Sequence, residues 1–234
     1  KYIAAGPLAS RWLQQQFATD ATLIRSGAQV LGEPAAGYLS HPGYAALPKA
    51  PYRYQEMLGV IWRENPSCYL EDGEQAVLMA ALMETDNAGR PLIDAWINRS
   101  GLSANAWLEK LFEATVIPFY HLLCRYGVAL IAHGQNVTLV MKDYVPQRIL
   151  LKDFQGAMRL VDEDFPQAQS LPEQVKAVTA RLSADYIIHD LQTGNFVTVL
   201  RFISRLTLQC GVSETRFYQI LAEVLRGYMA AHPD

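Results

Sequence analysis

The pattern that most constrains this sequence is a long helix followed by a strand, a polar loop and a β-hairpin. Ser103 is a favourable N-cap residue, and Gly127 is a favourable residue to end a helix. The segment between them carries a mostly apolar stripe at helical spacing, formed by Leu108, Leu111, Phe112, Thr115, Val116, Phe119, Leu122 and Leu123. We therefore expect a helix over 103–127, a hairpin turn over 143–146, and strands over 128–132, 137–142 and 147–152.

The segments on either side of this pattern have different periodicities. Upstream, a helix over 8–17 follows a turn at Gly6 and Pro7, a loop covers 33–51, and strand-like runs cover 21–31, 54–63, 76–83 and 92–97. After Gly156 the β pattern stops, and helical stripes cover 171–186 and 217–228. The expected fold is α+β in one continuous unit. It has a β-rich, mostly antiparallel portion over 1–102, then a palm-like core with C-terminal helices over 103–234.

Charge and composition argue against several classes of protein. The 234 residues carry a net charge of -3 and a pI near 6.0, so the basic face that nucleic acids require is not expected. No uncharged apolar run reaches the roughly 18 residues of a membrane-spanning helix. Cys68, Cys124 and Cys210 form no CxxC motif, which argues against a disulfide framework or a zinc knuckle. We expect a cytoplasmic protein that binds neither nucleic acid nor membranes.

Polar residues flank the two strands of the predicted hairpin. His133, Gly134, Gln135 and Asn136 precede the first strand, and Asp153 follows the second. Because antiparallel strands return the chain to the same end, Asn136 and Asp153 should be neighbours. Amide and carboxylate oxygens are ligands that Mg²⁺ takes when it also binds nucleotide phosphates. The hairpin therefore indicates a site for Mg-ATP, with Asn136 and Asp153 on the metal.

Other polar side chains are expected near this end of the hairpin. His133 and Gln135 are placed to contact a phosphate or a reacting carboxylate. Lys152 either reaches a phosphate or forms a surface ion pair with the next residue. Arg63 ends a predicted strand, where it either clamps a carboxylate or phosphate or pairs with an acid at the sheet edge.

The order of these elements is similar to the catalytic core of protein and small-molecule kinases. In those enzymes a helix, a strand, a His-containing loop with a metal-binding Asn, a hairpin and an Asp-Phe-Gly segment follow one another. Here the loop is shorter, and Gln135 stands where a carboxylate would be needed to activate a substrate hydroxyl. The sequence therefore favours a site that holds Mg-ATP without a base for an alcohol.

Longer segments closely resemble the siderophore synthetases that work without a peptide-synthetase template. The matching segments are GPLASRWL, LGEPAAGY, APYRYQEMLGVIWREN, HGQN, LLKDFQG and LSADYIIHDLQTGNFVTVLRFIS, and the resemblance covers essentially all 234 residues. It implies a ligase that uses ATP and Mg²⁺. A citrate-derived carboxylate would attack the α-phosphate of ATP, and the acyl-adenylate would then react with N6-acetyl-N6-hydroxylysine to give an iron chelator.

The resemblance also implies roles for individual residues. His133, Gln135, Asn136 and Asp153 match the motif that binds ATP and magnesium, and Arg63 matches an arginine in a strand segment of the family. It further implies that relatives are longer and that their upstream half supplies more ATP-binding groups. We therefore expect the C-terminal half of an enzyme, which is a homo-oligomer at full length and has little activity without the upstream half.

Two other interpretations stay open from the residues themselves. One is a kinase-like phosphotransferase, which the hairpin order supports and the missing base opposes. The other is a non-catalytic nucleotide-binding or assembly module, which would retain Mg-ATP without turnover. The sequence does not decide whether citrate or its mono-substituted form is the acceptor.

Overall fold

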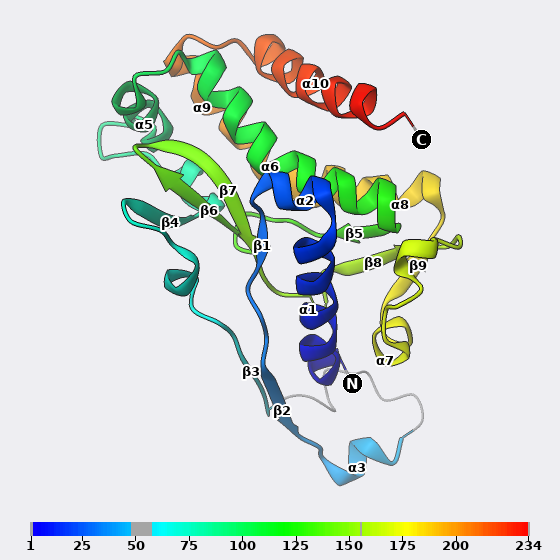
Figure 1. The fold of residues 1–234 in the computed structure, drawn as a ribbon. Helices are drawn as coiled ribbons and strands as arrows, with labels where there is room; N and C mark the ends of the chain where they lie inside the picture. Colours follow the sequence, from blue (N-terminus) through cyan, green and yellow to red (C-terminus); the bar gives the residue numbers. More distant parts are fainter. Residues whose placement is uncertain (1, 48–57, 155, 234) are drawn as a thin grey trace.

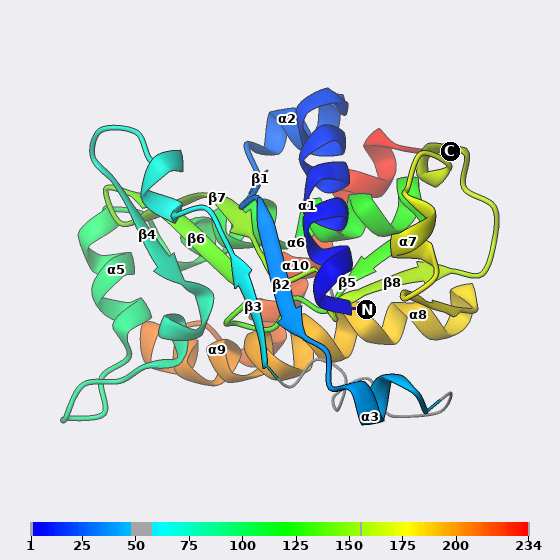
Figure 2. The same cartoon turned by 90° about the horizontal axis from the view of Figure 1, so that it is seen from below.

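The computed structural model describes residues 2–47, 58–154 and 156–233, and in this part of the chain helices pack against small β-sheets (Figure 1, Figure 2). The α-helices are α1 (Tyr2–Thr19), α2 (Ala21–Ser26), α3 (Pro42–Ala45), α5 (Leu92–Ser100), α6 (Ala104–Tyr126), α7 (Glu173–Lys176), α8 (Ala184–Leu191), α9 (Arg201–Leu206) and α10 (Glu214–Ala231). The strands are β1 (Gln29–Val30), β2 (Ala35–Leu39), β3 (Leu58–Trp62), β4 (Glu74–Leu78), β5 (Val128–Leu130), β6 (Val137–Lys142), β7 (Val145–Leu151), β8 (Met158–Val161) and β9 (Ala180–Leu182). The expected α+β fold is confirmed.

Shorter helical segments connect these elements. The 3-10 turns are η1 (Pro66–Tyr69), η2 (Met79–Met83), η3 (Pro166–Ala168) and η5 (Thr207–Cys210), and a π-helix, η4, spans Gln192–Leu200. In the described part of the chain, no helix combines the length and apolar character needed to cross a bilayer.

The largest sheet has the strand order β1-β7-β6-β4 and contains the predicted hairpin. In the β6–β7 pair Val137 lies opposite Leu151, so Asn136 and Asp153 emerge at the same end. The short strand β1 is parallel to β7, and the backbone N–H of Leu31 donates to the carbonyl of Leu151 at 2.8 Å. The end of β1 therefore meets the end of the hairpin that carries the predicted site.

Helix α6 lies against the hairpin, as its apolar stripe predicts. The Ser103 hydroxyl accepts a hydrogen bond from the backbone N–H of Ala106 and caps the helix, and Gly127 ends it at a φ of +60°. The buried indole of Trp107 donates to the carbonyl of Tyr144 at 2.8 Å, which fixes the hairpin turn to the first turn of α6.

One hydrophobic core joins elements from both parts of the chain. It includes Trp12 and Leu13 of α1, Phe112 of α6 and Phe217 of α10, together with inward residues of the hairpin. The rings of Phe112 and Phe217 meet edge to face, with centroids 5.0 Å apart. Burying one such side chain contributes about 1.5–3 kcal/mol, so this core holds the hairpin against α6 and holds α6 against α10.

The expected strand over 21–31 is wrong for most of its length. Residues 21–26 form α2 because Asp20 caps it, accepting hydrogen bonds from the backbone N–H groups of Thr22 and Leu23 at 2.8 and 3.0 Å. Gly27, with a φ of +66°, ends the helix in the left-handed conformation. Only the last part of the predicted strand pairs in a sheet, as β1.

The expected strand over 92–97 is also wrong, because this segment is the helix α5. Ile93 and Ile97 are four residues apart and share the buried face of α5, so tertiary packing decides between helix and strand for a short apolar run. The expected turn at Gly6 and Pro7 lies inside α1, where burial of Ala5 and Ala9 extends the helix toward the N-terminus.

The loop expected over 33–51 contains ordered elements where it is described. Strand β2 pairs antiparallel with β3, and this ribbon extends away from the sheets toward α3 (Figure 1). The strand over 54–63 is confirmed at β3, while residues 48–57 lie outside the described part. The strand over 76–83 is confirmed as far as Leu78, after which the chain turns into η2.

The expectation that β structure stops after Gly156 is wrong. Strand β8 pairs antiparallel with β5 and parallel with β9. The stripe over 171–186 is divided between α7, β9 and α8 instead of forming one helix, whereas the stripe over 217–228 lies in α10 as predicted. Because β1 and β9 both pair in parallel, the sheets are mixed and not purely antiparallel.

Candidate functional site

The hairpin brings the two predicted metal-binding residues together. The backbone N–H of Lys152 donates to the carbonyl of Asn136 at 3.3 Å, which places Asn136 beside the chain that continues into Asp153. Asn136, Lys152 and Asp153 line one small cavity with Phe119. Asn136 is only 7% exposed, whereas the Asp153 side chain is 38% exposed, so the site has a buried wall and an open rim.

The loop before β6 is a tight turn packed against η2. The backbone N–H of Asn136 donates to the carbonyl of His133 at 2.9 Å, and that of Ala80 donates to the carbonyl of Gly134 at 3.0 Å. A Cβ atom at Gly134 would lie 3.0 Å from the backbone of Ala80, so a larger residue at this position would push the two segments apart. The turn leaves His133 half-buried and Gln135 exposed at the rim.

Asn195 also supports this turn, although it was not predicted as a site residue from the sequence. Its side chain is fully buried, and its Nδ2 donates to the carbonyl of Ala132 at 3.1 Å. It lies on the π-helix η4, a form that is frequent at functional sites. A Cβ atom at Gly194 would approach Ile131 to 3.1 Å, so the helix packs closely here. The available signal was a Gly-Asn pair inside an otherwise apolar helical run.

Arg63 bridges two carboxylates at the open end of the hairpin. Its Nη2 lies 2.6 Å from Oδ1 of Asp153 and 2.8 Å from Oε1 of Glu33. The sequence left open whether Arg63 pairs with an acid at the sheet edge. The structure shows such a pair, with Glu33, which follows β1, as the partner. Asp153 has a φ of +68°, a left-handed backbone that is uncommon for residues other than glycine. Such backbone conformations occur preferentially at functional sites.

The three charges at this site influence one another. Burial raises the pKa of Glu33, although its contacts with Arg63 act in the opposite direction. Burial by itself would lower the pKa of Arg63, but the hydrogen bond to Glu33 and the charge of Asp153 outweigh it and raise that pKa. The guanidinium therefore stays charged and compensates two acids.

A metal at this site would need ligands from outside the protein. In the described residues, no three His, Cys, Asp or Glu side chains gather as a metal-binding group. Asn136 and Asp153 supply an amide oxygen and a carboxylate, which are the hard ligands that Mg²⁺ accepts. Mg²⁺ commonly completes its shell with water and substrate phosphates, so these two residues fit a metal that arrives with a nucleotide.

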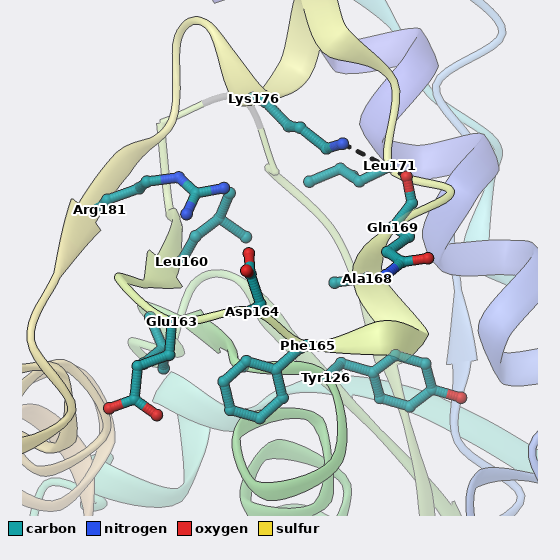
Figure 3. Close-up of a pocket in the computed structure, with 12 residues that line it drawn as sticks. Tyr126, Leu160, Glu163, Asp164, Phe165, Ala168, Gln169, Leu171, Lys176 and Arg181 are labelled. Carbon is teal, nitrogen blue, oxygen red and sulfur yellow. Dashed lines mark hydrogen bonds between the residues drawn. The ribbon is translucent and has the colours of Figure 1, made fainter.

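Two of the other cavities lie away from the hairpin. The first, beside Tyr126, is lined by the acids Glu163 and Asp164 and by Lys176 and Arg181 (Figure 3). Its cations already have partners, because Lys176 pairs with Glu173 at 2.8 Å and the guanidinium of Arg181 lies 3.7 Å from Asp162. This arrangement offers no converging set of groups for a reaction.

The second cavity, of about 830 Å³, lies between α2, α6 and α10. Here Nδ1 of His121 lies 2.7 Å from the hydroxyl of Tyr228, and its Nε2 lies 3.1 Å from Oδ1 of Asp20. Asp20 also accepts a hydrogen bond from the hydroxyl of Tyr126 at 3.1 Å. This buried cluster ties the C-terminal helix to the N-terminal part of the chain.

Two family models match different parts of the chain. Residues 1–84 match the family model described as "IucA / IucC family", and residues 105–234 match one described as "Ferric iron reductase FhuF-like transporter". Aerobactin synthase from Escherichia coli is 70% identical over 234 residues, which are 100% of this chain and 40% of that protein. The chain thus spans about two-fifths of the length of this relative.

Solved structures agree with these matches. Aerobactin synthetase IucC from a hypervirulent pathotype of Klebsiella pneumoniae superimposes with a TM-score of 0.91 at 67% identity, over 99% of this chain and 41% of that one. ATP-bound aerobactin synthetase IucA from the same source, at 19% identity and a TM-score of 0.73, shares the fold over 96% of this chain and 41% of that one. The chain therefore belongs to the IucA / IucC family of siderophore synthetases, as its sequence segments predicted.

Proposed function

We propose that this chain forms the nucleotide-binding part of an ATP-dependent ligase of siderophore biosynthesis. The observation that carries the proposal is the convergence of Asn136, Asp153 and Arg63 at the open end of the β6–β7 hairpin. The family and the aerobactin synthases that resemble the chain supply the substrate class. The proposed substrates are a citrate-derived carboxylate, ATP and N6-acetyl-N6-hydroxylysine, and the proposed product is aerobactin.

The proposed reaction has two steps. A carboxylate oxygen forms a bond to the α-phosphorus of ATP, the bond between that phosphorus and the bridging oxygen breaks, and pyrophosphate leaves. The amine of N6-acetyl-N6-hydroxylysine then attacks the acyl carbon, AMP leaves, and the amine loses a proton. A carboxylate is already a nucleophile at neutral pH, so the first step needs no base, in keeping with Gln135 at the position where a kinase would need one.

Each residue at the site has a proposed task. Asn136 and Asp153 would hold Mg²⁺, which supplies positive charge to the phosphates when it is bound. Arg63 would orient the reacting carboxylate and stabilise the negative charge that develops on the phosphate oxygens. His133, Gln135 and Lys152 would contact the phosphates from the rim. The rigid hairpin and the buried turn hold these groups in place before the substrates bind.

Calorimetric titration of the chain with ATP tests the nucleotide site, once with Mg²⁺ and once with a chelator. The proposal expects binding that depends on Mg²⁺ and weakens in the variants Asn136→Ala and Asp153→Ala. A fold check by circular dichroism accompanies each variant. Binding of equal affinity in both variants and the wild type would show that the nucleotide does not use this site.

A further inference from the structure

Two short segments of the sequence, 31–34 and 62–65, pack against each other beside the proposed site. The LGEP segment follows β1, and the WREN segment begins at Trp62, the last residue of β3. The backbone N–H of Gly32 donates to the Glu64 carboxylate at 2.7 Å, and the N–H of Glu64 donates to the carbonyl of Gly32 at 2.9 Å. A Cβ atom at Gly32 would lie 2.6 Å from that carboxylate, so a larger residue here would displace the Glu64 side chain.

Glu33 is held rigidly at the centre of this crossing. Its side chain is fully buried, and its backbone N–H donates to the hydroxyl of Ser10 at 3.0 Å, which anchors it to α1. Its Oε1 accepts hydrogen bonds from Nε and Nη2 of Arg63 at 3.3 and 2.8 Å. The backbone N–H of Asp153 also interacts with this carboxylate. The buried carboxylate of Glu33 therefore contacts both the guanidinium of Arg63 and the backbone of Asp153, the proposed metal ligand.

The exposure of these side chains increases from Glu33 outward. Glu33 is 0% exposed, Arg63 25% and Asp153 38%. A buried carboxylate that holds two guanidinium nitrogens restricts the rotation of the whole planar group. Glu33 thus sets the orientation of the Arg63 guanidinium from its buried side, while the more exposed Asp153 contacts the same nitrogen, Nη2.

We propose that Glu33 is a positioning residue of the nucleotide site: through its buried contact it fixes the guanidinium of Arg63 beside Asp153, where the phosphates and the reacting carboxylate would bind. This inference rests on the function proposed above. Glu33 does not touch substrate itself. In the variant Glu33→Gln an amide oxygen can still accept a hydrogen bond from the backbone N–H of Asp153, so the effect of that substitution on binding should pass through Arg63.

The chain contains a matched control for this pair. Glu74 and Arg148 form a second ion pair with 4% and 14% exposed side chains. Glu74 lies opposite Lys142, at the end of the hairpin remote from Asn136. Glu74→Gln therefore removes the buried acidic partner of Arg148 without touching the site. Any general loss of stability from breaking a buried pair should appear in both variants.

The test measures Mg-ATP affinity by calorimetry in the wild-type chain, Glu33→Gln, Glu74→Gln, Arg63→Ala and the double variant Glu33→Gln/Arg63→Ala. We expect Glu33→Gln to weaken binding by about tenfold or more and Glu74→Gln to change it by less than about twofold. Since Glu33 acts through Arg63, its substitution should add almost nothing in the Arg63→Ala background, as a double-mutant cycle detects.

The possible outcomes separate the two claims. If the wild-type chain binds no Mg-ATP, the same titration is made on the chain joined to the upstream part of a synthetase, and an absence of binding there refutes the proposed function itself. Wild-type binding that Glu33→Gln leaves unchanged, or losses that are additive with Arg63→Ala, overturn the positioning role alone. If Glu33→Gln does not fold, the nitrogen-15 signal of the Arg63 Nε–H group in the wild type decides: it should shift when Mg-ATP is added and not with Mg²⁺ alone. An unshifted signal also overturns the role.

Discussion

Replacing Asp153 by glycine should separate stability from binding. Asp153 holds a left-handed backbone with a φ of +68°, which glycine adopts without the steric cost of a Cβ atom. The same substitution removes a proposed metal ligand and a contact of Arg63. We therefore expect Asp153→Gly to fold about as well as the wild type and to lose Mg-dependent nucleotide binding.

The expected change in the free energy of unfolding follows from three opposing effects. Relief of the left-handed backbone is worth about 1 kcal/mol or somewhat more. The greater freedom of glycine in the unfolded chain costs roughly 0.5–1 kcal/mol. The lost ion pair joins side chains that are 25% and 38% exposed, and such pairs contribute about 0–1 kcal/mol. The net change should therefore stay within about 1 kcal/mol.

The assay combines urea unfolding, followed by the fluorescence of the buried Trp12 and Trp107, with titration of Mg-ATP. Asp143→Gly is the matched control, since Asp143 has a φ of +50° in the turn at the opposite end of the same hairpin. Both variants should be about as stable as the wild type, and only Asp153→Gly should bind Mg-ATP at least about tenfold more weakly. A loss of stability above about 2 kcal/mol with unchanged binding would refute the reasoning.

Three further predictions follow from the same contacts. Asn136→Ala should abolish metal-dependent nucleotide binding with an unchanged circular dichroism spectrum; retained binding would exclude its amide as a ligand. Gly134→Ala should lower the unfolding free energy by roughly 1–3 kcal/mol in urea titration, because its Cβ meets the backbone of Ala80 at 3.0 Å; a neutral effect would contradict that packing. The folded-state pKa of Asp20 is lowered, since hydrogen bonds from the backbone and His121 outweigh burial. Its charge therefore stabilises the fold above the unfolded pKa near 3.9, so Asp20→Asn should destabilise the chain at pH 7, and this difference should fade as the pH falls below about 4; a difference independent of pH would contradict the assignment.

The hairpin and its polar end could be predicted because their signals are local. A strong cap at Ser103, a long apolar stripe and two turn residues defined α6 and the β6–β7 pair. The neighbourhood of Asn136 and Asp153 then followed from antiparallel geometry alone. In contrast, the short apolar runs over 21–31 and 92–97 have no periodicity that separates helix from strand, and capping by Asp20 and tertiary packing decided them.

The residues that surround the site depend on contacts between distant segments. Glu33 and Arg63 are thirty positions apart and meet because the start of β2 pairs with the end of β3. Asn195 is more than fifty positions from the turn that it supports. A single sequence shows such residues only as isolated polar positions near strand ends or within apolar helices, so their partners became visible with the fold.

The central claim is that this chain contributes its hairpin site to an AMP-forming ligase. The most direct measurement is nucleotide product analysis for the chain joined to the upstream part of a synthetase, with Mg-ATP, a citryl substrate and N6-acetyl-N6-hydroxylysine. Reactions that omit each organic substrate, and one with the chain alone, serve as controls. AMP that forms only when both organic substrates and both parts are present is the predicted result. ADP as the product would contradict the ligase account and indicate a phosphotransferase, and full turnover by the chain alone would show that essential groups have been misplaced.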